Sequence, residues 1–351
     1  MHDVDQEFLR THGTLPWVFS AASPMWDMEY ADDTIMMCRD PDILEELLHI
    51  LEEKAARVGL LLNHSKCEHM QINSVARLHF RTQPLGQCEC PRCSTVAPIQ
   101  PGRLVPTSTL VKYLGIYLAP NSSPTQDMSR RIGKAYGASK LLAPFFKNKS
   151  LPKDWKVLVY RQVIQNIVLY ASESTTMTQA LMNKMDALHF RVLRQIFGYK
   201  STYYHRVLQP TATPASNEWI HSEMHRLAIK APTLTQLASQ RRQKLFGHMF
   251  RHPETPEYQS CFNNMGSFRR VSNSKLRVGA PRIHWPEMAM VEAYSRIQQL
   301  GTGYRPHWKD YGHAYFKTPD KTAVYNALGT SVRSFYDSTT LLRVVKPAAL
   351  D

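Results

Sequence analysis

The stretch WDMEYADDTIMM, residues 26–37, places short apolar segments on either side of an acidic turn. Alternating apolar residues around Asp32 and Asp33 predict a β-hairpin within residues 17–38, with both carboxylates at its tip. Two adjacent carboxylates repel each other, and a divalent cation would offset that charge. Asp32 and Asp33 are therefore candidate Mg²⁺ ligands, the alternative being an ordinary surface turn.

A helix is expected directly after this hairpin. Asp40 can cap it, Pro41 suits its first turn, and Gly59 ends it. Its apolar positions are Leu44, Leu47, Leu48 and Leu51, and we expect Glu45, Glu46, Glu52 and Glu53 on the opposite face. Residues 68–82 and 109–118 are predicted to be further strands, separated by a loop rich in Pro, Gly and Cys.

From about residue 120 the apolar period changes from that of a strand to that of a helix. We expect a helix from near Pro124, a second capped by Ser150, and a third from Thr178 to Gly198. The second should bury Trp155, Leu158, Val159, Ile164, Ile167 and Val168. Helical patterns recur at 216–230, 234–251 and 286–300. The predicted fold class is α+β, with domains at 1–119, 120–200 and 201–351.

Charge is distributed unevenly along the chain. Residues 1–70 hold five Lys/Arg against fourteen Asp/Glu, whereas residues 101–215 hold sixteen against four. A block this basic suits a polyphosphate partner, because released counterions supply much of the affinity, although a solvated basic surface is the simpler alternative.

Composition also excludes some classes of protein. No apolar run reaches the length of a transmembrane helix, and the acidic start MHDVDQEF is unlike a secretory signal. The six cysteines do not follow the pattern of a secreted disulfide-rich domain. We therefore expect an intracellular protein, in the cytoplasm or nucleus, that is neither secreted nor membrane-bound.

Several boxes occur in the order found in one polymerase family. Tyr30-Ala31-Asp32-Asp33 is followed by Gly59-Leu60 with Asn63, Lys66 and Glu68, by Tyr113-Leu114-Gly115, and by Leu169-Tyr170 with Glu173. Later boxes are Arg191 to Gly198, Leu245-Phe246-Gly247-His248, and Gly279-Ala280-Pro281-Arg282 with Trp285. Over residues 1–295 the chain resembles the reverse transcriptases of non-LTR (LINE-type) retrotransposons, from part of the palm through the helical thumb. Cys67 stands where threonine is usual.

The resemblance implies an RNA-directed DNA polymerase with Mg²⁺ at Asp32 and Asp33 and a catalytic lysine at Lys66. It implies that Tyr113, Leu114 and Gly115 form the primer-grip turn. The implied partners are an RNA template, an RNA–DNA or DNA duplex, and a deoxynucleoside triphosphate. The residues expected to contact phosphates lie on the basic helices: Arg130, Arg131, Lys134, Lys140, Lys147, Lys149, Lys153 and Lys156.

Two-metal chemistry needs a third carboxylate, which in this family lies on an earlier palm strand. Only Asp3, Asp5, Glu7, Asp27 and Glu29 precede Tyr30, and none has that context. We therefore expect a truncated chain that binds Mg²⁺ weakly and does not extend a primer alone. The alternatives are a non-catalytic nucleic-acid-binding remnant and a non-functional relic of a mobile element.

Two further constellations are weaker. Cys88, Cys90 and Cys93 could hold Zn²⁺ only with a fourth ligand, for which Cys67, His64, His69 and His79 lack diagnostic spacing. His221 and His225 share a helix face, but Glu223 is one position too late for a metalloprotease site.

Overall fold

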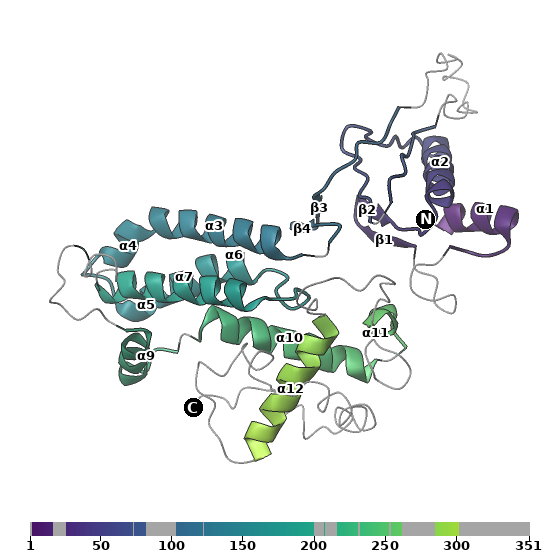
Figure 1. The fold of residues 1–351 in the computed structure, drawn as a ribbon. Helices are drawn as coiled ribbons and strands as arrows, with labels where there is room; N and C mark the ends of the chain where they lie inside the picture. The colour runs from purple at the N-terminus through teal and green to yellow at the C-terminus, as the bar shows by residue number, and fades with distance from the viewer. Residues whose placement is uncertain are drawn as a thin grey trace. The chain divides into compact units, whose positions relative to one another are not determined.

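The computed structural model describes residues 2–16, 26–72, 74–81, 103–121, 123–199, 207, 216–230, 232–252, 254–261 and 285–301. The chain divides into two compact units, residues 1–123 and residues 124–351 (Figure 1). The first unit combines helices with small antiparallel hairpins, and the described part of the second is helical. This agrees with the α+β prediction. The three-domain division stays a prediction.

The first unit is built around the predicted acidic hairpin. Its strands are β1 (Asp27–Tyr30) and β2 (Asp33–Met36), which pair antiparallel from Asp27 with Met36 to Tyr30 with Asp33. Helix α1 (His2–His12) precedes the hairpin. A small core joins Val4 and Phe8 of α1 to Trp26 and to Leu47 of the following helix. The hairpin prediction is confirmed for residues 27–36, and residues 17–25 lie outside the described part.

Helix α2 (Pro41–Arg57) is bounded as the sequence predicts. The Asp40 carboxylate accepts a hydrogen bond from the Asp42 amide at 2.9 Å, and Gly59 beyond the helix has a φ of 81°. The expectation that Glu52 lies on an outer face is wrong, because only 2% of its surface is exposed. Its carboxylate is satisfied by His64 Nε2 at 2.7 Å and by the Arg81 amide at 2.9 Å.

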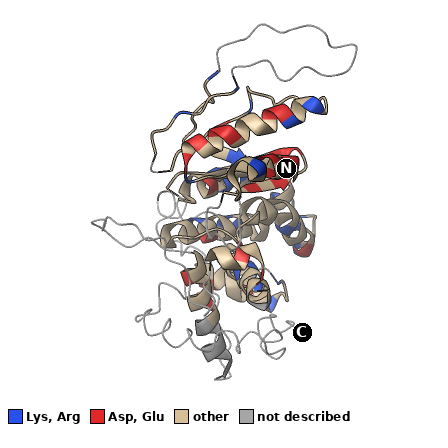
Figure 2. Ribbon diagram, turned by 90° about the vertical axis from the view of Figure 1, so that its right-hand side faces the viewer, with Lys and Arg blue, Asp and Glu red and all other residues tan. Residues whose placement is uncertain are grey.

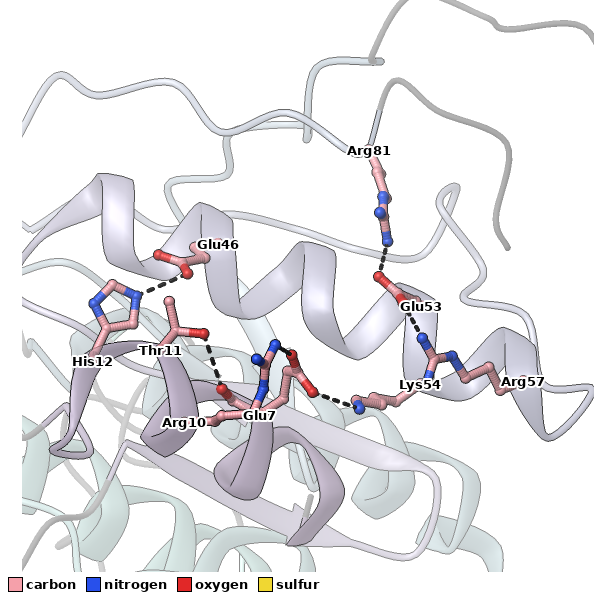
Figure 3. Close-up of polar contacts among 9 residues, drawn as sticks. All are labelled: Glu7, Arg10, Thr11, His12, Glu46, Glu53, Lys54, Arg57 and Arg81. Carbon is pink, nitrogen blue, oxygen red and sulfur yellow. Dashed lines mark hydrogen bonds and ion pairs between the residues drawn. The ribbon is translucent and has the colours of Figure 1, made fainter. Parts of the chain in front are cut away.

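Ion pairs fasten α1 to α2 (Figure 3). The Glu7 carboxylate accepts from Arg10 at 2.5 Å and from Lys54 of α2 at 3.1 Å. These cations lower the pKa of Glu7 to about 2, the hydrogen bond with Arg10 being the largest cause. His12 contacts Glu46 at 2.8 Å, also across the two helices. Glu46, an acidic residue of α2, thus helps to anchor one helix to the other. Figure 2 shows where acidic (red) and basic (blue) residues lie along the ribbon.

The prediction of a continuous strand over residues 68–82 is wrong. Among the described residues of this segment only isolated bridges form, between His69 and Thr107 and between His79 and Leu104. Backbone hydrogen bonds from Phe80 to Arg103 and from Val105 to Leu78 hold this segment, and Phe80 and Val105 share a small core with Leu78. The amide of His79 donates to Glu45 of α2 at 2.8 Å. Helix side chains thus replace part of a strand ladder.

A second hairpin ends the first unit. Strands β3 (Val111–Tyr113) and β4 (Ile116–Leu118) pair antiparallel within the predicted 109–118 segment. Leu114 and Gly115 form its two-residue turn, with φ of 45° and 81°. Two positive φ values match the twist of a tight hairpin, so Gly115 suits its place, whereas a leucine there is uncommon.

The second unit packs its described helices around one hydrophobic core. The first of them are α3 (Thr125–Leu141), α4 (Ala143–Lys147), α5 (Lys153–Val159), the π-helical segment η1 (Tyr160–Gln165), α6 (Asn166–Leu169) and α7 (Gln179–Phe197). The later ones are α9 (Asn217–Arg226), α10 (Leu234–Arg251), α11 (Pro256–Cys261) and α12 (Trp285–Gly301). Residues of α3 and of α12 contribute to the same core. The predicted helices after Pro124 and at 216–230, 234–251 and 286–300 are confirmed.

The helix that starts with α5 differs in two respects from the helix predicted to be capped by Ser150. Pro152, not Ser150, stands at its N-cap and makes no side-chain cap. Trp155 and Leu158 are 61% and 54% exposed, although both were predicted to be buried. Val157 and Tyr160 face the core instead. The last helix of the predicted bundle is as expected: the Thr178 hydroxyl caps α7, and Gly198 ends it with a φ of 80°.

Long-range contacts tie α10 and α12 to the earlier helices. The buried Arg242 guanidinium binds the buried Glu292 carboxylate at 2.6 and 2.7 Å. Trp285 Nε1 donates to the Glu173 carbonyl at 2.6 Å, and Arg241 donates to the Leu169 carbonyl at 2.8 Å.

Among the described helices, none combines the length and apolar character needed to cross a bilayer.

Candidate functional site

The tip of the first hairpin is a tight and strained turn. Tyr30 and Asp33 are its last paired residues, so Ala31 and Asp32 alone reverse the chain. Ala31 has a φ of 55°, in the region that costs an L-residue about 1–2 kcal/mol. Such strain clusters at functional sites, where the surrounding structure fixes the turn. The geometry holds Asp32 and Asp33 side by side at the end of the ribbon.

Both carboxylates are open to solvent. Asp32 and Asp33 are exposed, and within the described ranges no hydrogen bond or ion pair reaches either side chain. Strand alternation puts Asp33 on the same face of the hairpin as Met28 and Tyr30. Tyr30 is 65% exposed and Met28 37%. The turn therefore presents adjacent unpaired carboxylates beside an open apolar face.

Further acids strengthen the negative field at the base of the hairpin. Burial and the neighbouring carboxylates of Asp5 and Glu29 raise the pKa of Asp27. Asp5 accepts a hydrogen bond from Trp26 Nε1 at 3.0 Å. Asp27 lies at the opposite end of the two strands from the turn that carries Asp32 and Asp33.

The donor set is nevertheless small. In the part of the chain that the structure describes, no group of three or more His, Cys, Asp or Glu side chains is placed to hold a metal ion. Asp32 and Asp33 fit a Mg²⁺ ion as two of its oxygen ligands, and water or phosphate would have to supply the rest.

Lys66, the predicted catalytic lysine, lies in the turn that follows α2. Its amide donates to the Asn63 carbonyl at 2.9 Å, and its side chain is exposed. Among the described residues, no ion pair or hydrogen bond joins Lys66 to Asp32 or Asp33. The assignment of Lys66 to the site stays a prediction.

The predicted primer-grip residues form the turn of the second hairpin. Tyr113 ends β3, and Leu114 and Gly115 follow with positive φ. The side chains of Tyr113 and Leu114 are half-buried, whereas Gly115 is exposed. The exposed backbone at Gly115 carries no Cβ, so a ligand backbone could approach it closely.

The predicted phosphate-binding cations do not all reach the surface. Those that are exposed are Arg130, Lys134, Lys140, Lys147, Lys149 and Lys153. Lys153 also lies over the Phe197 ring, at 5.3 Å from its centroid. Arg131 and Lys156 are only 6% and 4% exposed, so both leave the candidate set. Arg131 pairs with the buried Asp127 and lies 5.5 Å from the Tyr170 ring centroid.

The structure adds a surface cation that the sequence reasoning missed. Arg191 of α7 is exposed and its guanidinium lies 4.2 Å from the ring centroid of Tyr136 on α3. The ring fixes the guanidinium on the same side of the bundle as α3. The sequence pattern predicts only that Arg191 lies in a helix. Its ring partner Tyr136 is 55 positions away, so no local signal indicates the contact.

The predicted zinc ligands Cys88, Cys90 and Cys93 lie outside the described residues. Of the candidate fourth ligands, His64 bonds to Glu52 and His79 contacts Glu45. His221 and His225 lie in α9, with His221 half-buried and His225 exposed. Among the described residues no group of metal-binding side chains supports either the zinc site or the histidine-pair site.

Comparison with known protein families gave a match over a segment that includes the first hairpin. Residues 27–118 match a family model described as reverse transcriptase (RNA-dependent DNA polymerase). Comparison with curated proteins gave no match, and neither did comparison with solved structures. The matched segment contains both hairpins and α2, including Asp32, Asp33 and Tyr113 to Gly115. Residues 27–118, less than half of the chain, are thus similar to the reverse transcriptase family.

Proposed function

We propose that this chain is part of an RNA-directed DNA polymerase of the non-LTR retrotransposon type, with Asp32 and Asp33 as its metal-binding carboxylates. The observation that carries the proposal is the strained turn with two adjacent, exposed and unpaired carboxylates, lying inside the reverse-transcriptase match. A tight two-residue turn has positive φ whatever its charge, so it is the pair of adjacent like charges that a bound cation would explain.

Each described part has a distinct task in this proposal. The carboxylates of Asp32 and Asp33 hold Mg²⁺, which when bound aligns the triphosphate and the attacking hydroxyl and offsets their charge. The turn at Tyr113, Leu114 and Gly115, exposed at Gly115, seats the primer end. The exposed lysines of the helical unit hold the template–primer duplex through its phosphates.

The open face of α3 supports duplex binding. Arg130 and Lys134 lie one turn apart on this helix. A Cβ added to the neighbouring Gly133 or Gly137 would meet nothing within 4 Å. Glycine inside a helix costs about 1 kcal/mol relative to alanine, yet both occur where nothing in the described chain fills the space. A phosphate backbone could therefore approach α3 closely beside its cations.

Two carboxylates do not complete a two-metal centre. We propose that nucleotide transfer needs an additional carboxylate beyond Asp32 and Asp33. The chain alone is then expected to bind template–primer duplex without extending the primer.

Iron-mediated cleavage tests the metal site even where binding is weak. Fe²⁺ replaces Mg²⁺ in the full chain, and ascorbate with peroxide generates radicals that cut the backbone near the ion. We expect cuts within residues 30–34 that excess Mg²⁺ suppresses and that Asp32→Asn with Asp33→Asn abolishes. Glu29→Gln, an acid on the same hairpin, serves as the matched control and should keep the cuts. Cleavage that ignores the double substitution would refute the assignment.

A further inference from the structure

Three exposed aromatic side chains gather where α5 begins, α7 ends and α9 begins. Trp155 is 61% exposed, Trp219 is 40% exposed and Tyr199 is 36% exposed. The Tyr199 and Trp219 rings meet edge to face at 4.5 Å. Lys153 of α5 lies 5.3 Å from the Phe197 ring at the end of α7, which joins the two elements. Figure 1 shows α5 and α9 at the same end of the helical unit. We call Trp155, Tyr199 and Trp219 the aromatic end.

Packing elsewhere forces these rings outward. Helix α5 turns Val157 and Tyr160 into the core, and Trp155 lies roughly opposite Val157 on a helix of about 3.6 residues per turn. Helix α9 buries Ile220, and its first turn is fixed by the Trp219 amide, which donates to the Ser216 hydroxyl oxygen at 3.0 Å. Both tryptophans therefore sit in the first turn of a well-anchored helix with much of each ring in solvent.

Two lysines that precede Trp155 in the sequence are also exposed. Lys147 ends α4 and Lys149 lies in the turn before α5, and both are exposed. Residues 140–156 contain five lysines and a single acid, Asp154. Flat aromatic rings can stack on planar bases, and ammonium groups attract phosphates. Nucleic acid with unpaired nucleotides offers both groups, so it is the partner that fits this surface.

We infer that the aromatic end binds an unpaired strand of nucleic acid by stacking bases on Trp155 and Trp219, while Lys147 and Lys149 contact its phosphates. The inference rests on the proposed function, because it adds a single-strand site to a duplex-binding chain. A duplex hides its base faces within its own stack and would meet only the lysines. Single strands and duplexes should therefore respond differently to loss of the rings.

The test measures binding of the full chain to a labelled single strand and to a duplex of the same length, by fluorescence anisotropy over a salt series. Base–aromatic stacking is worth about 1–3 kcal/mol per base, so Trp155→Ala or Trp219→Ala should weaken single-strand binding about fivefold to a hundredfold. Duplex affinity and the salt slope should stay as in the parent chain. Lys149→Ala should instead lower the slope of log K against log salt by about one unit for both ligands.

Controls separate stacking from general apolar contact and from misfolding. Leu158→Ala removes an apolar side chain that is 54% exposed on the same helix, and should leave single-strand binding unchanged. Trp155→Phe keeps a ring and should retain most of the affinity. Equal single-strand affinity for the parent chain and both tryptophan variants would overturn the inference, as would an equal loss in Leu158→Ala. Neither outcome touches the metal site, which the iron cleavage of the hairpin tests separately.

Discussion

The Tyr160 hydroxyl lies 2.6 Å from Nδ1 of His189, and both side chains are fully buried in the core of the helical unit. Burial lowers the pKa of His189 to about 4 and raises the pKa of Tyr160. The tautomer of the neutral imidazole decides whether the hydroxyl or Nδ1 is the donor in this hydrogen bond. The π-helical segment that begins at Tyr160 places this hydroxyl, so the pair joins it to α7.

Acid should destabilise the helical unit through this pair. Above the ordinary histidine pKa of 6.5, the folded and unfolded chains are both deprotonated at His189. Between pH 6.5 and about 4 the unfolded chain binds the proton and the folded one does not, so the free energy of unfolding falls. The loss should reach roughly 3 kcal/mol. His189→Gln should flatten this part of a pH series of denaturant melts. An unchanged pH profile would contradict the assignment.

Loss of the buried Glu292 carboxylate should strongly destabilise the helical unit. Glu292→Ala leaves the Arg242 guanidinium buried without its partner on α12. Breaking a buried pair from one side costs about 3–5 kcal/mol. Urea melts of the full chain would measure the shift. Glu257→Gln, an exposed acid on α11, is the control and should stay within about 0.5 kcal/mol of the parent.

Alanine substitution of Lys134 should change duplex binding, whereas alanine substitution of Arg131 should change the stability of the fold. Lys134 is exposed, so Lys134→Ala should lower the salt slope of duplex binding by about one unit and leave the melting curve alone. Arg131 is buried against Asp127, so Arg131→Ala should destabilise the fold instead. Binding titrations at several salt concentrations, paired with melts, distinguish the two. A reduced slope without destabilisation in Arg131→Ala would show that its burial is wrong.

Alanine at Gly133 or Gly137 should stabilise α3 while weakening duplex binding. Each substitution should add about 1 kcal/mol of helix stability, since a Cβ there meets nothing within 4 Å. The same methyl would occupy the space through which a phosphate backbone approaches. Melts and duplex titrations of the two variants measure both effects. Greater stability with unaltered affinity would show that the nucleic acid does not lie on this face.

Local signals gave the hairpins and most helix boundaries. Asp40, Pro41 and Gly59 bound α2 through caps that act within a few residues, and Thr178 and Gly198 do the same for α7. The turn at Tyr30-Ala31-Asp32-Asp33 could likewise be predicted, because the alternation of apolar residues and the preferences of turn residues are local properties. The exposed position of Asp32 and Asp33 at the hairpin tip could therefore be predicted from the sequence alone.

Which side of a helix faces inward was less predictable. Residues 155–169 are apolar on nearly every face, so Trp155 could not be assigned from periodicity, and the buried face of α5 follows from its packing partners. Buried charges were missed for the same reason. Glu52 is buried because His64 and the Arg81 amide satisfy it, and both partners lie beyond the end of its helix. Long-range contacts of this kind leave no periodic signal.

We propose that the two hairpins of the first unit hold the reacting primer end. A primer with a photoreactive 3′-terminal nucleotide, annealed to an RNA template, tests this by cross-linking to the full chain. We expect cross-links in peptides containing residues 27–36 and 111–118, lost when unlabelled template–primer competes. Cross-links confined to other parts of the chain, with none in either hairpin, would contradict the account.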